Sequence, residues 1–288
     1  MKKKEKKFRE PLNLRKEARL LPGYLILMAW VVFTAVLIGW IVMASFSTTK
    51  EIFSNDLLAG GFQFKNYVKS WTTGKFSVYF LNSIIYTAFS LVTTILISAP
   101  AAYVLSRYKF LGSKLIQRLF VMALSVPPIM LVMPLYGQAV QWGLLDNRFV
   151  IMFIYMCINV PFATFFLINY FATLSTTFEE AAAIDGCTSR QTFFKIMLPL
   201  VQPGIITVGI FLFVNVWNEF VIAFIFAKST GIKPLGVGLF SIIQSMKNTG
   251  DWAALFASVM IVVLPTFILY LFLSQKIIAG VTGGGVKE

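Results

Sequence analysis

The residues whose types and spacing are most distinctive lie between 179 and 204, where the sequence reads EEAAAIDGCTSRQTFFKIMLPLVQPG. Two acids followed by three alanines predict a helical piece over 178–184, because acids suit the positive end of a helix dipole. Gly186 predicts a turn, since glycine adopts a positive φ at little cost. Thr188, with a glutamine three residues later, predicts a capping box that begins a second piece, which Pro199 would stop. Small alanines allow another surface to approach the first piece closely, and the alternative is that the segment packs only on its own membrane spans.

The chain offers little for catalysis or metal binding. It contains no histidine, which is the commonest general base and a common metal ligand. Cys157 and Cys187 lie thirty positions apart without a partner motif, so no disulfide framework is indicated. The glycines at 280–285 are followed by Val286 and Lys287, where a phosphate-binding loop requires Gly-Lys and then Ser or Thr. We therefore expect no enzyme activity, no catalytic residue, no metal site and no cofactor in this chain.

Composition indicates a membrane protein. Of the 288 residues, 58% are hydrophobic and 16% are aromatic, which is more apolar surface than one soluble core could bury. The net charge of +13 could suggest nucleic-acid binding, but nine Lys or Arg against three Glu lie in the first nineteen residues, directly before an apolar run. Such a basic segment is typical of the cytoplasmic flank of a membrane span. We therefore expect contact with membrane lipid and none with nucleic acid.

Apolar runs predict six membrane-spanning helices and an all-α membrane protein. A bilayer core of about 30 Å requires about 20 apolar residues in a helix. The runs of that length are 24–46, 80–103, 115–140, 149–171, 205–227 and 252–273. The chain is accordingly divided into a basic cytoplasmic tail (1–20), a transmembrane domain (21–279) and a cytoplasmic C-terminal tail (280–288).

The distribution of Lys and Arg predicts the orientation. Seventeen of the 25 lie in the N-terminal tail, in the connections between runs two and three and between runs four and five, and at the C-terminus. Because the side richer in these residues is cytoplasmic, both termini and the segment 179–204 are expected inside. The connection from Lys228 to Asp251 then lies outside, and its four glycines predict an adaptable surface loop.

Prolines and polar residues interrupt the runs. Pro127 and Pro128 must break the hydrogen-bond ladder of the third run, which predicts a bend that lines a pathway. Glu219 stands clearly inside the fifth run, so we expect a polar seam that faces the bundle. The candidates for lining a pathway are Tyr136, Asn159, Asn215, Trp217, Asn218 and Glu219, with Asn169 considered beside them. The asparagines could instead bond a neighbouring helix, and the tryptophan could lie at the membrane interface.

The segment 179–204 also resembles the EAA loop in permeases of ATP-binding-cassette (ABC) importers. Asp185 lies within this loop, and seven positions agree at the family's spacing, namely Glu180, Ala181, Ala182, Gly186, Ile196, Leu198 and Pro199. Further segments are similar to the smaller permease subunit of maltose-type carbohydrate importers, namely AAYVLSRYKFLG at 101–112, WNEF at 217–220 and PLGVGL at 234–239. The resemblance covers nearly the whole chain and departs at Glu288, where the family usually ends in glycine.

This resemblance implies a type I ABC importer permease fold in a bacterial cell membrane, with the loop 178–200 as the element that couples to an ATPase. It further implies a second, unlike permease, a dimer of cytosolic ATPases that bind ATP and Mg²⁺, and an extracellular solute-binding protein, which the connection 228–251 would contact. The solute would be a carbohydrate, in the first place an oligosaccharide, carried by alternating access. The alternative is a proton- or ion-coupled secondary transporter, which usually has several intramembrane carboxylates or an internal repeat.

Overall fold

The computed structural model describes residues 14–283, and all regular structure within this range is helical. The predicted all-α fold is therefore confirmed. The predicted tails lie partly outside the described residues, which leave out 1–13 and 284–288. The tail boundaries predicted at residues 20 and 280 coincide with no helix end, because the first helix begins at Leu14 and the last continues to Gly283.

Four helices are long and apolar enough to cross a membrane. They are α1 (Leu14–Ser45), α4 (Phe76–Arg107), α7 (Arg148–Thr173) and α14 (Trp252–Gly283). Each covers a predicted run to within one residue and extends past it at one end or both. The extension arises because a helix continues through polar residues that reach the membrane interface, whereas an apolar run ends at them. Up to six spans result if each of two bent helix pairs counts as one.

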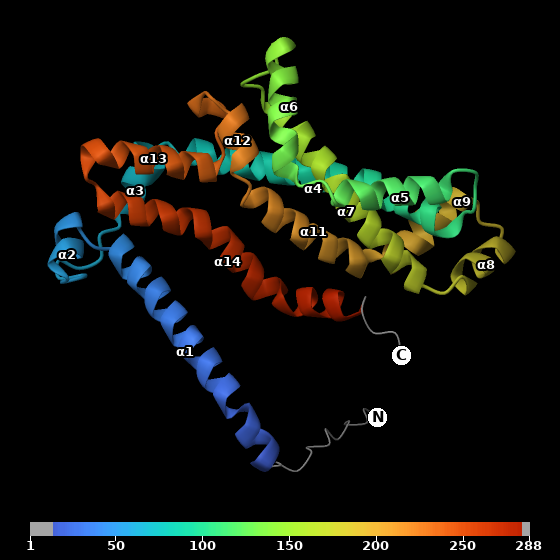
Figure 1. Ribbon diagram of the computed structural model, residues 1–288, viewed down its shortest axis with the longest axis horizontal. Coiled ribbons are helices and arrows are strands. Elements are labelled where there is room, and N and C mark those ends of the chain that lie inside the picture. The colour runs from blue at the N-terminus through green and yellow to red at the C-terminus, as the bar shows by residue number, and fades with distance from the viewer. Residues whose placement is uncertain (1–13, 284–288) are drawn as a thin grey trace.

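The predicted span 115–140 contains the break that Pro127 and Pro128 predicted. This run is split into α5 (Ser113–Leu124) and α6 (Pro128–Gln141), which meet at 94°. Pro127 and Pro128 have no N–H to donate, and Pro127 is extended with φ −60° and ψ 128°, so the ladder of α5 cannot continue. Figure 1 shows α6 projecting away from the rest of the bundle.

The predicted span 205–227 is interrupted as well. It is split into α11 (Gln202–Trp217) and α12 (Val221–Phe226) by three residues, of which Phe220 has the irregular dihedrals φ −124° and ψ −43°. No proline or glycine lies between residues 210 and 230, so the usual helix breakers do not explain this interruption. Its cause is the side chain of Glu219, one of the three residues in the break.

The expectation of an adaptable loop between Lys228 and Asp251 is also wrong. This connection contains the short 3-10 turn η2 (Thr230–Ile232) and the helix α13 (Leu235–Thr249). The glycine at 238 does not loosen this helix, because it lies against a side chain of α4. Glycine in this helix therefore permits close packing of α13 on α4 rather than flexibility.

Side chains of α4 hold the start of this connection. Asn82 Nδ2 donates to the carbonyl oxygens of Gly231 and Lys233, both at 2.9 Å. The hydroxyl of Tyr86 donates to the carbonyl oxygen of Ile232 at 2.6 Å. These bonds satisfy three successive backbone acceptors of an irregular segment, which explains why it keeps one position on α4.

Asp146, in the connection between α6 and α7, holds the same segment from the other side. Its Oδ1 accepts the N–H groups of Lys228 and Ser229, both at 2.8 Å. The bond from the Ser229 N–H is the main reason why the pKa of the Asp146 carboxyl lies below its ordinary value. The anchoring carboxylate is thus present at neutral pH, and its contribution is lost only as the pH falls through that lowered pKa.

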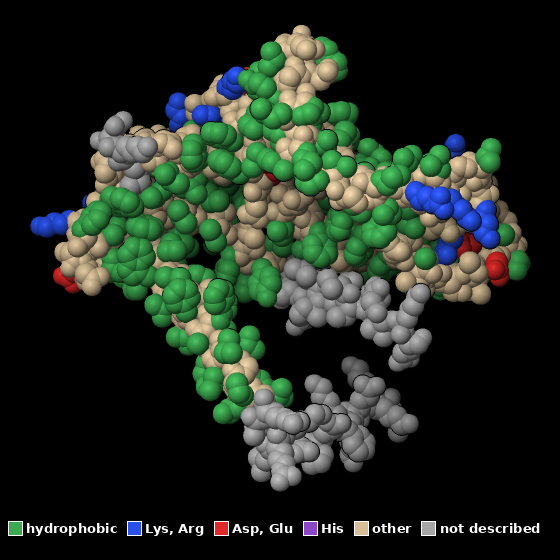
Figure 2. All heavy atoms as spheres, viewed as in Figure 1, with side chains coloured by type: hydrophobic (Ala, Val, Ile, Leu, Met, Phe, Trp, Pro, Cys, Tyr) green, Lys and Arg blue, Asp and Glu red, His purple; other side chains and the backbone are tan. Residues whose placement is uncertain are grey.

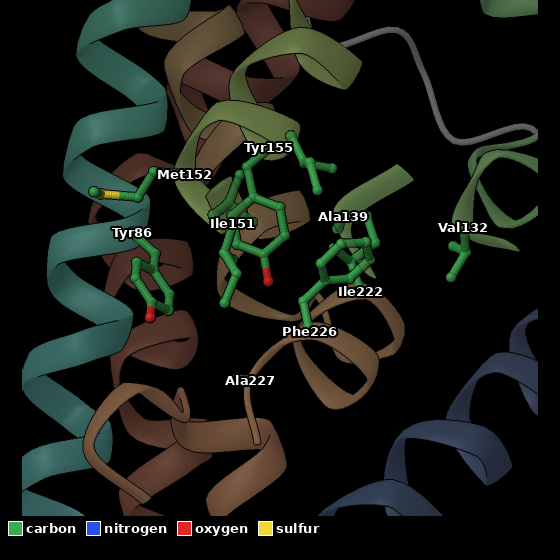
Figure 3. Packing of buried hydrophobic residues seen from close by; sticks show 11 residues of the cluster. Tyr86, Val132, Ala139, Ile151, Met152, Tyr155, Ile222, Phe226 and Ala227 are labelled. Carbon is green, nitrogen blue, oxygen red and sulfur yellow. The ribbon is translucent and has the colours of Figure 1, made fainter. Parts of the chain in front are cut away.

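The packing of α4 on α7 forms the centre of the bundle. Tyr86 of α4 meets Tyr155 of α7 edge to face, with ring centroids 6.2 Å apart (Figure 3). Farther along α4, the buried positions Ser90, Thr94 and Ser98 recur at a spacing of four and share one face. Small side chains at that spacing let two helices approach closely within a membrane, where hydrophobic burial alone does not drive association.

α1 stands apart from the bundle. None of its 18-residue apolar window is buried, and Figure 2 shows apolar side chains over its described surface. Figure 1 shows that it meets the rest of the molecule only near its C-terminal end. A helix that is apolar all round and unburied has its place in lipid or against another membrane chain.

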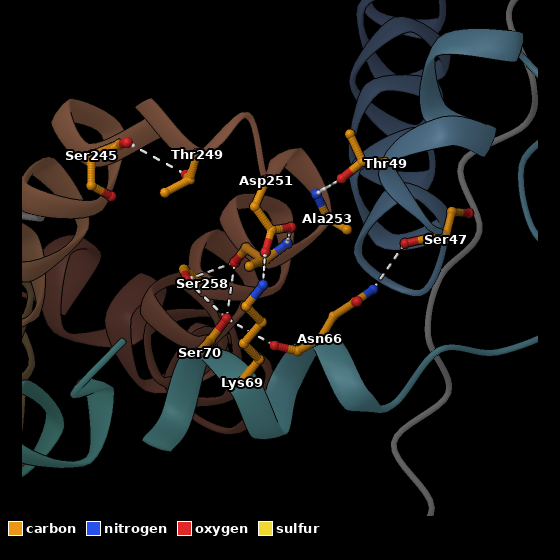
Figure 4. Close-up of polar contacts among 11 residues, drawn as sticks. Ser47, Thr49, Asn66, Lys69, Ser70, Ser245, Thr249, Asp251, Ala253 and Ser258 are labelled. Carbon is orange, nitrogen blue, oxygen red and sulfur yellow. Dashed lines mark hydrogen bonds and ion pairs between the residues drawn. The ribbon is translucent and has the colours of Figure 1, made fainter. Parts of the chain in front are cut away.

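Two short helices, α2 (Thr49–Ser54) and α3 (Lys65–Thr72), connect α1 to α4 and fasten both to α14. Asn66 Nδ2 donates to the carbonyl oxygen of Ser47 at 2.9 Å (Figure 4) and to that of Ser45, the last residue of α1, at 3.0 Å. The Nζ of Lys69 pairs with the carboxylate of Asp251, directly before α14. This end of the bundle is therefore organised by polar contacts, as expected for a part that reaches water.

Gly238 allows a test of the packing of α13 on α4. A Cβ added at residue 238 would lie 2.1 Å from Cδ2 of the buried Tyr79 ring, so either the ring or the helix must move. We expect Gly238→Ala to lower the unfolding free energy by about 1–3 kcal/mol, measured by thermal unfolding in detergent. Gly236→Ala is the matched control, because its Cβ would make ordinary contact at 3.7 Å with Phe220 and alanine favours a helix. Equal melting temperatures for the two variants would contradict this packing.

Candidate functional site

The segment 178–200 lies at the end of the bundle opposite α2 (Figure 1). It is a helical hairpin that consists of α8 (Thr177–Ile184), a turn, and the consecutive helices α9 (Ser189–Gln191), η1 (Thr192–Met197) and α10 (Leu198–Leu200). The first predicted piece, 178–184, is confirmed to within one residue. α11 follows directly and is bent by 68° from the second piece.

The turn of the hairpin has the predicted chemistry. Gly186 has φ +75°, a conformation that side chains with a Cβ rarely adopt. The capping box is complete: the N–H of Thr188 donates to Gln191 Oε1 at 2.8 Å, and the N–H of Gln191 donates to Thr188 Oγ1 at 3.4 Å. Both the turn glycine and the helix start are therefore confirmed.

The second piece ends one residue later than the predicted stop at Pro199. The helix continues through Pro199 to Leu200, and the chain bends at Val201 instead. Pro199 lacks the N–H that an α-helix requires, and the backbone before it widens into the π-helix η1, in which the N–H of Leu198 donates to the carbonyl of Phe193. The helix thus accommodates the proline by a change of hydrogen-bond pattern.

The hairpin presents some of the predicted docking residues outward and buries others. Ala182 is buried, and Ile196 and Leu198 are half-buried. The exposed ones are Glu180, Ala181, Asp185, Gly186 and Pro199. Four of these residues lie in α8 and the turn, and Pro199 lies in α10 at the other end of the second piece. A partner surface could reach the exposed part of α8 and the turn without any rearrangement of the hairpin.

The inner face of the hairpin packs on the ends of α4 and α7. The ring of Phe193 lies 5.1 Å from that of Tyr103, which in turn lies 5.5 Å from Phe171. Met197 is fully buried in the same cluster. Glu179, in the first turn of α8, also lies on this inner side, but the sequence analysis did not select it as a site residue. The signal available for it was the basic end of α4, where Arg107 could pair with an acid at the start of another helix.

A polar seam runs between α7 and α11, as the intramembrane carboxylate predicted. Asn215 Nδ2 donates to Asn159 Oδ1 at 2.8 Å, and Asn159 Nδ2 donates to the carbonyl of Tyr155 at 2.7 Å. The hydroxyl of Tyr155 then donates to Glu219 Oε2 at 2.6 Å. Asn218, expected in the seam, is not part of it, because its Nδ2 donates to the carbonyl of Val214 in its own helix.

Glu219 causes the break between α11 and α12. Its Oε1 accepts the N–H of Ile222 at 2.7 Å, and its Oε2 accepts the N–H of Ala223 at 3.1 Å. These two N–H groups belong to the first turn of α12 and would otherwise have no partner. A carboxylate that caps a new helix start is favoured there by the helix dipole, so α12 begins at this acid without a proline or glycine.

The seam borders a cavity of about 220 Å³. Pro128 at the start of α6 and Glu219 before α12 both line it, so the two helix breaks open on the same space. Irregular backbone at membrane depth is tolerated where it lines a cavity rather than lipid. The remaining lining residues are Ile129, Val132, Tyr155, Ile158, Asn159, Asn215, Val216, Val221 and Ile222.

Other candidates lie away from this cavity. Tyr136 is bound by Lys228, whose Nζ lies 3.3 Å from the tyrosine oxygen and 5.5 Å from the ring centre. The indole of buried Trp217 donates to the carbonyl of Val262 in α14 at 3.2 Å. Asn169 is exposed and bonds a carbonyl of its own helix. Within residues 14–283, no three of His, Cys, Asp and Glu gather as metal ligands would.

Comparison with known proteins agrees with this architecture. Residues 94–279 match the family described as "Binding-protein-dependent transport system inner membrane component". The chain is 33% identical to the diacetylchitobiose uptake system permease protein NgcG of Streptomyces coelicolor, over 91% of this chain and 87% of that protein. It is 31% identical to the trehalose/maltose transport system permease protein MalG of Thermococcus litoralis, over 86% and 90%.

A solved structure has the same fold. It is a chain of a bacterial ABC transporter involved in the import of the acidic polysaccharide alginate, with a TM-score of 0.79 and 23% identity. The match covers 92% of this chain and 99% of that chain. Two proteins that superpose over this share of their lengths have the same order and arrangement of helices.

The broken helical bundle with its hairpin at one end defines a membrane-embedded permease subunit of an ABC importer. The chain belongs to the family of inner membrane components of binding-protein-dependent transport systems. The resemblance noted in the sequence is therefore confirmed. This family transports solutes across a membrane and does not consist of enzymes.

The carboxylate of Glu219 allows a test of the seam. Glu219→Leu leaves the first N–H groups of α12 and the hydroxyl of Tyr155 without an acceptor, at about 1–3 kcal/mol for each buried group. Glu219→Gln retains one acceptor oxygen, so it should keep the fold and most transport, whereas Glu219→Leu should lose both stability and transport. Thermal unfolding in detergent and uptake into vesicles measure the two effects. Wild-type behaviour of both variants would show that the seam is dispensable.

Proposed function

We propose that this permease transports a carbohydrate, in the first place an oligosaccharide. The observation that carries the proposal is the similarity, over at least 86% of this chain, to two permeases whose names state diacetylchitobiose uptake and trehalose/maltose transport. The cavity supports it, because the amides of Asn159 and Asn215 can bind hydroxyl groups while its other lining is largely apolar. On this proposal Asn159, Asn215 and Glu219 line the sugar pathway.

We infer an assembly of unlike subunits. A second, different permease completes the pathway, and two cytosolic ATPases bind ATP and Mg²⁺ beneath the pair, while an extracellular binding protein delivers the sugar. The unburied apolar surface of α1 supports a neighbour within the membrane. The hairpin is a single docking element per chain, so two permeases would serve two ATPases.

The hairpin 178–200 is proposed as the element that docks on an ATPase. Its exposed residues near the turn, among them Glu180 and Asp185, are available to a partner, and its buried face holds it on α4 and α7. The charge distribution supports a cytoplasmic location for the hairpin and for both tails, 1–20 and 280–288, with 21–279 as the membrane domain. The membrane is that of a bacterial cell, and η2 and α13 lie on its outer side, where the binding protein arrives.

Uptake into proteoliposomes tests the proposed function. The chain is purified with the products of its neighbouring genes and supplied with diacetylchitobiose or maltose together with the cognate binding protein. We expect accumulation that requires ATP and the binding protein and persists when a proton ionophore is added. Uptake that needs an ion gradient instead of ATP would identify the alternative, a secondary transporter. A purified chain that is monodisperse and active as a homodimer would contradict the assembly of unlike subunits.

The turn of the hairpin tests the docking role. Gly186→Val should abolish uptake and release the ATPase from the membrane, because a β-branched residue is strained at φ +75° and would change the angle of the hairpin. Gly186→Asn should retain most activity, since asparagine tolerates this conformation. Glu180→Lys should weaken docking through its reversed charge.

A matched control separates docking from general strain. Gly143 also has a positive φ (+66°) and open space around an added Cβ, but it lies between α6 and α7. Gly143→Val should therefore reduce stability without releasing the ATPase. Normal uptake by Gly186→Val with the ATPase still bound would refute the docking role.

A further inference from the structure

The guanidinium of Arg107 joins three elements at the cytoplasmic end of the bundle. Arg107 is the last residue of α4, and its Nε donates to Glu179 Oε1 in the first turn of α8 at 2.9 Å. Its Nη2 donates to the carbonyl oxygen of Leu174, which caps the C-terminus of α7, at 2.8 Å. One side chain thus fastens the start of the hairpin to the ends of two long helices.

This contact is sheltered from water. The side chains of Arg107 and Glu179 are 11% and 18% exposed, whereas those of the other ion pair in residues 14–283, Lys69 and Asp251, are 59% and 24% exposed. Exposed ion pairs contribute little, but a sheltered pair that loses one partner leaves a charge without compensation. The geometry also requires arginine, because two nitrogens of the planar guanidinium point to two different acceptors.

Packing makes this joint rigid. Four residues before Arg107, Tyr103 lies between Phe171 of α7 and Phe193 of η1. Gln117 of α5 donates to the carbonyl of Leu105 at 2.6 Å, so α5 is held at the same place. A displacement of α8 therefore cannot be absorbed locally and must move the end of α4.

The opposite end of α4 holds the segment before α13. Asn82 and Tyr86 bind the carbonyl oxygens of residues 231–233, and Ser83 Oγ accepts the N–H of Leu235 at 2.9 Å. The helix has 32 residues, so it is about 48 Å long at 1.5 Å per residue. One helix thus connects the hairpin with the outer segment, and both of its ends are held by specific hydrogen bonds.

We propose that Arg107 and Glu179 are positioning residues that transmit the movement of the docked hairpin to α4, and through α4 to the segment 231–235. The inference rests on the proposed function, because it requires an ATPase that moves the hairpin. Glu180, adjacent in sequence but exposed, then has a different task at the ATPase surface. Loss of the Arg107–Glu179 contact leaves the ATPase bound and active but disconnects it from the cavity.

The experiment uses the complete complex in proteoliposomes. Cys157 and Cys187 are replaced by serine, and a cysteine is introduced at Ile129, which is exposed and lines the cavity. The measured quantity is the rate of labelling by a fluorescent maleimide with and without ATP and vanadate. In this background, ATP should change the labelling rate, since alternating access changes exposure of the cavity.

Four variants of the Arg107–Glu179 contact, called the clamp from here on, are compared with one control. Arg107→Gln, Glu179→Gln and the double variant should each reduce the ATP-dependent change by about fivefold or more, the double no further than either single one. The ATP-dependent change in Arg107→Lys should lie between that of the unaltered contact and that of Arg107→Gln, because one amine cannot bind both acceptors. Lys109→Gln is the matched control: it removes the same charge from an exposed position and should leave the change intact. The amount of ATPase that co-purifies should be unaltered in all of them.

The outcomes separate this inference from the proposed function. An undiminished response in Glu179→Gln would overturn the role of the clamp while leaving the importer assignment in place. Loss of the ATPase from the clamp variants in proportion to the lost response would also overturn the role of the clamp. The lost response would then come from a folding defect and not from a defect in transmission. Absence of any ATP-dependent change in the wild-type background, with the ATPase bound, would count against the proposed function itself.

Discussion

The packing of α4 against α7 is the interaction on which the other contacts depend. It is made by small buried residues such as Ser90, Thr94 and Ser98, which allow the two backbones to come close where lipid provides no hydrophobic drive. With α7 fixed beside it, α4 supplies the surface for α11, for α13 and for the inner face of the hairpin. The long helix also reaches both ends of the bundle, so its position determines where the outer segment and the hairpin lie.

A second constraint is that backbone groups inside a membrane need partners within the protein. The bundle breaks two helices, after Leu124 and after Trp217, and each break creates backbone groups without an intrahelical partner. At the first break the consecutive prolines have no N–H groups that need an acceptor. At the second break Glu219 accepts two backbone N–H groups from the first turn of α12. Both breaks border one cavity, where the polar seam meets a largely apolar lining and no irregular backbone at the breaks need face lipid.

The class of fold and the local form of the hairpin follow from the amino-acid sequence alone. Apolar runs of membrane length fix an all-helical membrane protein, because only a helix satisfies every backbone group within its own segment. The glycine at the turn and the Thr188–Gln191 box depend on neighbours within three residues, so their form could be derived from spacing. The consecutive prolines likewise reveal a break, since a missing N–H is a property of the residue itself.

Which polar residues meet depends on how the helices pack in three dimensions. Glu179 and Glu180 are adjacent acids in the first turn of α8, and the ion pair of Glu179 follows from the place where α4 ends, 72 positions earlier. Asn159 meets Asn215, whereas Asn218, three residues after Asn215, bonds the carbonyl of Val214 instead. That break contains no helix-breaking residue and arises from a carboxylate that reaches forward to cap α12 with support from Tyr155 of another helix. Contacts of this kind depend on the relative positions of whole helices, which local spacing does not contain.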